Sequence, residues 1–194
     1  MIQSHLILSM GTPGWVLAAA AVIVVVAAVG IYNGLVRRRV AVRDGWAQID
    51  VQLQRRHHLI PNLVETVKGY AAHEKTALEG VIAARNQAAA ASGPAAVGAA
   101  EGLLGAALGR VFALSEAYPD LKANAGFIQL GQELASAENL IGSARAQYNR
   151  LVADYNTSIT VVPSVILARP LGFREEEFFE IEEPAAREVP KVRF

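Results

Sequence analysis

The feature that most constrains this chain is an uninterrupted apolar segment close to its N-terminus. Residues 1–36 contain no Lys, Arg, Asp or Glu, and the apolar run extends from Trp15 to Tyr32. Its 18 residues would form a helix about 27 Å long, close to the hydrocarbon thickness of a bilayer. An aromatic ring stands at each end, where such rings favour the headgroup level. The segment predicts a transmembrane helix over 15–32, preceded by a short N-terminus, residues 1–14.

A cleaved signal peptide is the alternative interpretation, with the small residues at 28–30 as its cleavage site. Signal peptides carry a positive charge before the apolar run. Here only His5 precedes it, which favours a retained anchor. Arginines cluster directly after the run, and basic residues mark the cytoplasmic side of a membrane helix. We therefore expect a non-cytoplasmic N-terminus and a cytoplasmic domain.

All 18 basic and 18 acidic residues follow the apolar segment, so the remainder has the composition of a soluble domain. The net charge is zero, which argues against a nucleic-acid partner. The chain has no cysteine, which excludes a thiol nucleophile, a disulfide framework and thiolate-ligated zinc.

Apolar residues recur every three or four positions after the apolar segment, which predicts an all-α domain. The expected helices cover 37–56, 59–91, 95–117 and 125–161. The last has a heptad seam, an apolar stripe that must be buried against other helices. The residues of the seam are Phe127, Leu130, Leu134, Ala137, Ile141, Ala144, Tyr148, Leu151 and Tyr155.

Two breaks in the pattern leave alternatives open. Pro61 either begins a new helix after a turn or kinks one long helix, and we favour the turn. The adjacent His57 and His58 are then expected on the surface of that turn. Glycines recur along one face of the third helix, which predicts close approach of a neighbouring helix backbone; a poorly ordered helix start is the alternative. These glycines are Gly98, Gly102, Gly105 and Gly109.

Motifs that carry chemistry are missing from the sequence. There is no Glu-x-x-His pair for a di-iron site, no H-E-x-x-H and no glycine-rich phosphate loop. We expect a chain that is not an enzyme and has no metal, no cofactor and no small-molecule substrate.

Long motifs closely resemble the LemA family of bacterial membrane proteins. The first covers 46–56 (WAQIDVQLQRR) and runs into 59–70 (LIPNLVETVKGY). Others are EAYPDLKAN at 116–124 and the Tyr-Asn pairs at 148–149 and 155–156. One departure is His58, where family members usually carry an aspartate.

The resemblance implies a single membrane helix in the bacterial inner membrane and an antiparallel four-helix up-and-down bundle, here over 33–162. It implies no reaction, because the family has no established enzymatic activity. After Pro163 the helical pattern fades. An ordered C-terminal segment is expected over 163–183, and a mobile tail over 184–194.

Two sets of residues are candidate surfaces. A lipid-facing or partner-facing set near the membrane comprises Arg37, Arg38, Arg39, Trp46, Asp50, Arg55 and Arg56. An intramolecular ion network that caps the bundle is the alternative role for Trp46, Asp50, Arg55 and Arg56. A self-association set comprises Tyr148, Asn149, Tyr155 and Asn156. Its tyrosines are otherwise core residues whose hydroxyls reach polar partners.

The sequence thus favours a non-enzymatic, membrane-anchored scaffold or assembly protein that self-associates. Its partners would be the lipid bilayer and further copies of itself. The alternative is an adaptor that recruits or regulates another membrane protein, such as a protease or a sensor kinase.

Overall fold

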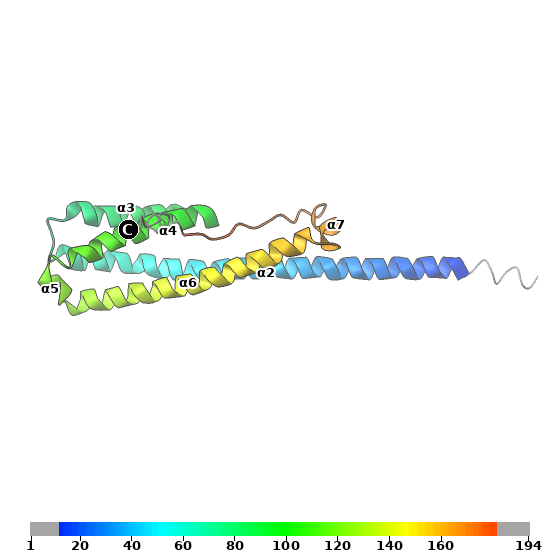
Figure 1. Ribbon diagram of the computed structural model, residues 1–194, viewed down its shortest axis with the longest axis horizontal. Coiled ribbons are helices and arrows are strands. Elements are labelled where there is room, and N and C mark those ends of the chain that lie inside the picture. The colour runs from blue at the N-terminus through cyan, green and yellow to red at the C-terminus, as the bar shows by residue number, and fades with distance from the viewer. Residues whose placement is uncertain (1–11, 182–194) are drawn as a thin grey trace, which may run out of the picture. The chain divides into compact units, whose positions relative to one another are not determined.

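The computed structural model describes residues 12–181, and every regular element in that range is a helix (Figure 1). The expectation of an all-α chain with an apolar N-terminal helix is confirmed. The tail expected over 184–194, and residues 1–11 of the expected short N-terminus, lie outside the described range. The helices are α2 (Thr12–Lys68), α3 (Lys75–Ala90), α4 (Pro94–Leu114), α5 (Pro119–Lys122), α6 (Ala125–Thr160) and α7 (Ser164–Ala168).

The chain divides into two compact units. Of the described residues, unit 1 holds 12–41 and 153–176, and unit 2 holds 42–152 and 177–181. Helices α3, α4 and α5 belong to unit 2, and α7 belongs to unit 1. Helices α2 and α6 contribute residues to both units.

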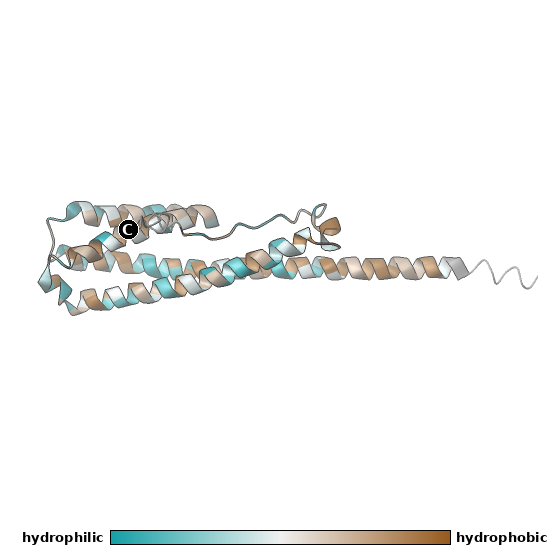
Figure 2. Cartoon of the chain, in the orientation of Figure 1, coloured by the Kyte–Doolittle hydropathy of each residue, from teal (hydrophilic) through white to brown (hydrophobic). Residues whose placement is uncertain are grey.

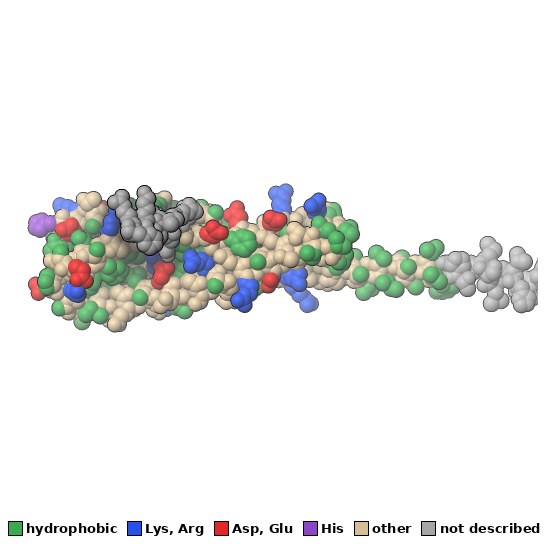
Figure 3. Space-filling view, in the orientation of Figure 1, with side chains coloured by type: hydrophobic (Ala, Val, Ile, Leu, Met, Phe, Trp, Pro, Cys, Tyr) green, Lys and Arg blue, Asp and Glu red, His purple; other side chains and the backbone are tan. Residues whose placement is uncertain are grey.

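In unit 1, the first part of α2 is apolar on every side. Residues 14–27 are all exposed, including Ile23 at 67%. Figure 2 shows this stretch in the colour of hydrophobic residues, and Figure 3 shows no charged side chain on its visible face. Within the described residues, α2 and α4 are the two helices long and apolar enough to cross a membrane. Half of α4 is buried, as in a core helix, whereas the apolar stretch of α2 is not buried at all.

The seam predicted along the fourth helix is confirmed as a packed face of α6. Each of its nine residues is buried or half-buried. In unit 2, the rings of Phe127 and Phe112 meet with centroids 5.7 Å apart, which joins α6 to α4. The predicted boundaries of this helix, 125–161, agree closely with those of α6.

The favoured turn at Pro61 is wrong, because α2 continues through this residue. A proline inside a helix has no N–H for the carbonyl four residues earlier, which here belongs to His57. In unit 2, that carbonyl accepts a hydrogen bond of 3.4 Å from Nε of Arg85 in α3. A side chain 28 residues away therefore takes the place of the missing backbone donor.

The helix expected over 59–91 is broken ten residues after its predicted start, because α2 ends at Lys68 and α3 begins at Lys75. Distant side chains hold this connection. The hydroxyl of Tyr118 donates to Glu74 (3.1 Å), and the amide of Asn124 donates to the hydroxyl of Tyr70 (2.9 Å). The EAYPDLKAN motif thus stabilises the connection between α2 and α3.

Candidate functional site

A cluster of charged side chains lies inside unit 2, where three helices meet. Glu101 of α4 is 1% exposed. Arg56 of α2 donates through Nη1 to its Oε2 (3.2 Å), and Nε2 of His57 lies 2.6 Å from its Oε1. Nη1 of Arg56 also lies 3.0 Å from Oε2 of Glu138 in α6. We call these four residues the ion cluster.

The ion cluster ties α2, α4 and α6 together. Burying an unpaired charge is costly, and removing one partner of a buried pair typically costs about 3–5 kcal/mol. Glu101 keeps both carboxylate oxygens paired, with Arg56 on one and His57 on the other. Glu138 is half exposed, so its contribution is smaller. The arrangement is that of a structural link between helices.

The expectation that His57 and His58 lie on the surface of a turn is wrong for His57. His57 is 8% exposed and contacts Glu101, whereas His58 is exposed. The two residues point to different sides because α2 remains helical there. Sequence reasoning missed Glu101 altogether. The spacing of Glu101 could have indicated its burial. It precedes the buried Leu104 and Leu108 by three and seven residues, which places it on the apolar face of α4.

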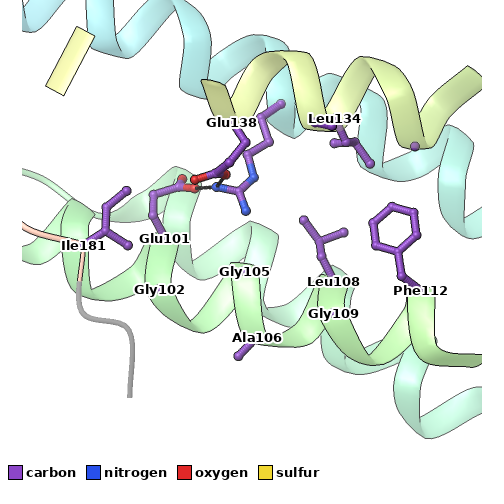
Figure 4. A pocket seen from close by; sticks show the side chains of 13 residues that line it. Glu101, Gly102, Gly105, Ala106, Leu108, Gly109, Phe112, Leu134, Glu138 and Ile181 are labelled. Carbon is purple, nitrogen blue, oxygen red and sulfur yellow. Dashed lines mark hydrogen bonds and ion pairs between the residues drawn. The ribbon is translucent and has the colours of Figure 1, made fainter. Parts of the chain in front are cut away.

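A groove of about 780 Å³ opens beside the ion cluster, between α4 and α6 (Figure 4). Glu101 and Glu138 lie at one end, where Arg56 is paired with both, and Phe112 lies towards the other. The other residues of α4 and α6 that line the groove are small or apolar. They are Gly102, Gly105, Ala106, Leu108 and Gly109 of α4, and Gly131, Leu134 and Ala135 of α6. The last described residue that lines the groove is Ile181.

The glycines that recur along α4 were expected to contact the backbone of a neighbouring helix. This expectation is wrong, because three of them line the groove instead. A Cβ added to Gly109 would meet no atom within 4 Å. Gly98 does have a close neighbour, which is an extended segment: a Cβ there would overlap the carbonyl oxygen of Glu180. We call residues 177–181, which include Glu180, the strap.

The predicted self-association residues bond to the chain itself. In unit 2, Asn149 pairs with both backbone groups of Phe179: its Nδ2 donates to the carbonyl (3.1 Å), and its Oδ1 accepts from the N–H (2.9 Å). Tyr148 donates from its hydroxyl to the carbonyl of Glu177 (2.8 Å). These bonds, together with the complete burial of Phe179, hold the strap on unit 2.

The same paired arrangement recurs in unit 1. Asn156 donates to the carbonyl of Glu176 and accepts from its N–H, each at 2.9 Å. Tyr155 is completely buried. An asparagine side chain can imitate a peptide group in this way, because it carries one donor amide and one carbonyl acceptor.

The residues of the predicted lipid or partner surface have different environments. In unit 1, Arg37 and Arg38 are exposed, and Arg39 lies 3.6 Å from Glu176. In unit 2, Asp50 and Arg55 are exposed.

Trp46 and Arg56, the other members of that surface, face inward. Trp46 is half-buried, and its ring centroid lies 5.5 Å from those of both Tyr148 and Phe179. Arg56 belongs to the ion cluster. Trp46 therefore packs under the strap, and an internal role fits both residues.

The connection between α2 and α3 contains a perturbed titrating group. The hydrogen bond from Tyr118 to Glu74 raises the pKa of Tyr118 above its ordinary value of 10.0, and burial and the negative carboxylate act in the same direction. Among residues 12–181, no three His, Cys, Asp or Glu side chains are grouped so that they could hold a metal ion.

Comparison with known proteins identifies relatives. Magnetosome protein MamQ of Magnetospirillum gryphiswaldense is 28% identical over 180 residues, an alignment that covers 79% of this chain and 66% of the relative. Magnetosome proteins MamQ 1 and MamQ 2 of Paramagnetospirillum magneticum match with the same identity and coverage. The chain thus spans about two thirds of the length of these relatives. The LemA family profile matches residues 45–194, well over half of the sequence, and the chain therefore belongs to the LemA family.

Proposed function

We propose that this protein is a non-enzymatic, membrane-anchored helical scaffold or assembly protein. The observation that carries the proposal is α2: one helix supplies both the exposed apolar stretch of unit 1 and buried residues of unit 2, such as Ile49 and Leu63. Exposing a helix that is apolar on every side to water is unfavourable, whereas the hydrocarbon core of a bilayer removes its side chains from water. Membership of the LemA family and relatives named as magnetosome proteins support a membrane location.

The proposed orientation places the N-terminus outside and unit 2 in the cytoplasm, at the bacterial inner membrane. Residues 37–58 contain six arginines and two aspartates, a net charge of +4. Basic residues next to a membrane helix favour the cytoplasmic side, and each contributes about 1 kcal/mol of attraction to anionic lipid. A reporter enzyme fused after Phe194 tests this orientation. Cytoplasmic activity supports it, and protease cleavage of unit 2 in intact spheroplasts contradicts it.

We further propose that the helices of unit 2 form an antiparallel four-helix up-and-down bundle. Its hydrophobic cluster draws residues from α2, α3, α4 and α6, as the family resemblance implies. Leu63 of α2, Val81 of α3 and Leu104 of α4 are all fully buried in it.

Tyr148 and Asn149, the residues first expected to mediate self-association, bond instead to the strap of their own chain. We therefore propose a different surface for self-association, a face between α2 and α6 in unit 2. Val51 is 60% exposed and Leu140 is 41% exposed there, beside a pocket of about 310 Å³. Gln48, Gln52 and Gln147 also line this pocket. An apolar centre with a polar rim is typical of a protein interface. Anchoring confines all copies to one plane and raises their effective concentration, so a weak contact suffices.

Native mass in mild detergent tests this assignment. Val51→Glu places a charge in the face and should convert an oligomer to a monomer. Ile82→Glu is the matched control, because Ile82 is a similarly exposed apolar residue (43%) on α3. A monomeric unmodified protein, or equal effects of the two substitutions, contradicts the assignment.

The same face supports the alternative function, an adaptor that recruits or regulates another membrane protein. Purification from membranes separates the two functions. A scaffold returns mainly further copies of itself, whereas an adaptor returns one stoichiometric partner whose binding is lost with Val51→Glu.

A further inference from the structure

We infer that the groove between α4 and α6 binds a small uncharged amphiphile, with a carboxamide or hydroxyl head and a single apolar tail. The inference goes beyond the proposed scaffold function and does not depend on it. The groove measures about 780 Å³, within the range of about 300–1,000 Å³ that is typical of small-molecule sites. Such sites combine mostly apolar walls with a few polar groups that orient the ligand.

The charged end of the groove offers a ligand one hydrogen-bond donor and one acceptor. Nη1 of Arg56 contacts both Glu101 and Glu138, whereas Nη2 has no hydrogen-bond partner among residues 12–181. Nη2 lies 3.6 Å from the position that a Cβ on Gly105 would occupy, beside the floor of the groove. Glu138 pairs with Arg56 through Oε2, and its half-exposed carboxylate keeps Oε1 for a donor.

These two groups select the head of the ligand. The Arg56 side chain is only 7% exposed, so a ligand that displaces water from Nη2 must supply an acceptor. A cationic head cannot do so, and an anionic head would approach the carboxylates of Glu101 and Glu138. A carboxamide meets both demands, because its carbonyl accepts from Nη2 while its N–H donates to Oε1 of Glu138. A hydroxyl group can also donate and accept.

The rest of the groove fits an apolar tail. From Glu101 to Phe112, α4 rises about 16 Å, and along this length it lines the groove with glycine, alanine and leucine (Figure 4). A Cβ added to Gly109 would meet no atom within 4 Å, so the floor is open there. A tail can therefore extend along α4 from the charged end to the ring of Phe112. The arrangement holds a ligand and implies no reaction.

Protection of single cysteines tests the site, because the chain has no cysteine of its own. Ala135→Cys places a thiol in the groove, and Ser136→Cys places one at an exposed neighbour that does not line it. The full-length protein is studied in bilayer discs without detergent, since detergents are themselves amphiphiles. We expect saturating octanamide to slow maleimide labelling about tenfold at position 135 and to leave the rate at position 136 unchanged.

The head and the floor are tested separately. N,N-dimethyloctanamide accepts a hydrogen bond but cannot donate one, so it should bind about tenfold more weakly than octanamide. This preference should vanish in Glu138→Ala and persist in Glu133→Ala, at an acid of the same helix that does not line the groove. Gly109→Leu fills the floor and should abolish protection, whereas Gly80→Leu, at an equally open glycine of α3, should preserve it.

Several outcomes would overturn the inference. Equal protection at positions 135 and 136, or protection that survives Gly109→Leu, would show that octanamide does not occupy the groove. Equal protection by octanoate or octylammonium would show that the charged end does not select an uncharged head. A thiol at position 135 that fails to react even without a probe would show that protein already fills the groove.

Discussion

At the scale of single residues, Glu101 links parts of the sequence that lie far apart. Its carboxylate contacts Arg56 and His57, which precede it by 45 and 44 positions. Its neighbours in the sequence are glycine, alanine and leucine, so nothing local solvates it. The pairing exists only because α2 and α4 pack together in unit 2. For this reason the sequence analysis missed the burial of both Glu101 and His57.

Replacing Glu101 should therefore destabilise unit 2 strongly. Glu101→Gln removes the charge and leaves Arg56 buried with only Glu138, so we expect a loss of about 3–5 kcal/mol in the free energy of unfolding. Glu138→Gln, at the exposed member of the cluster, should cost about 1 kcal/mol or less. Urea unfolding followed by circular dichroism measures both. Equal losses would show that the cluster is not organised around Glu101.

Tyr118 should give the fold a dependence on alkaline pH. Its pKa is raised in the folded state, chiefly by the hydrogen bond to Glu74, so folding favours the protonated phenol. The stabilisation is fully present below the unfolded pKa near 10.0 and is lost as the pH rises through the raised value. The difference in melting temperature between the native protein and Tyr118→Phe should shrink from about pH 9 to about pH 11. A constant difference would contradict this role.

At the scale of elements, the periodicity of apolar residues predicted the features that depend only on residues close together in the sequence. The α6 seam and the helical class follow from apolar residues at intervals of three and four. Features that depend on one distant partner escaped prediction. Where α2 continues through Pro61, the carbonyl of His57 accepts from Arg85, and the strap bonds to Asn149 and passes close to Gly98. The glycine pattern on α4 did signal close backbone approach, but the approaching backbone is extended and meets Gly98.

The link between Arg85 and Pro61 can be measured with a double-mutant cycle. Arg85→Ala leaves the carbonyl of His57 without its side-chain donor, which should cost about 1 kcal/mol. In a Pro61→Ala background the new N–H of residue 61 bonds that carbonyl, so the same substitution should cost less. Additive losses in thermal unfolding would show that the two residues are not coupled.

The strap should depend on Asn149. Asn149→Ala removes both hydrogen bonds to Phe179 and should increase the hydrogen-exchange rate of the Phe179 amide about tenfold. Asn139→Ala is the control, because Asn139 is an exposed asparagine of the same helix. Unchanged exchange at Phe179 in Asn149→Ala would mean that the buried ring alone holds the strap.

At the scale of the whole molecule, the central claim is that α2 anchors the chain in a membrane. Unit 1 carries an exposed apolar stretch, and unit 2 carries a packed core with a buried ion cluster. The exposed apolar stretch lies within residues 1–36, which the sequence already sets apart because they carry no Lys, Arg, Asp or Glu. The membrane-anchored scaffold assigned above depends on this helix being retained and inserted.

Alkaline carbonate extraction of membranes, combined with intact-mass measurement, tests this claim most directly. Carbonate strips peripheral proteins and leaves inserted helices in the pellet. The account predicts that the protein remains in the pellet and that its mass includes residues 15–32. Release into the supernatant, or a mass showing cleavage near Gly30, would contradict a retained transmembrane anchor.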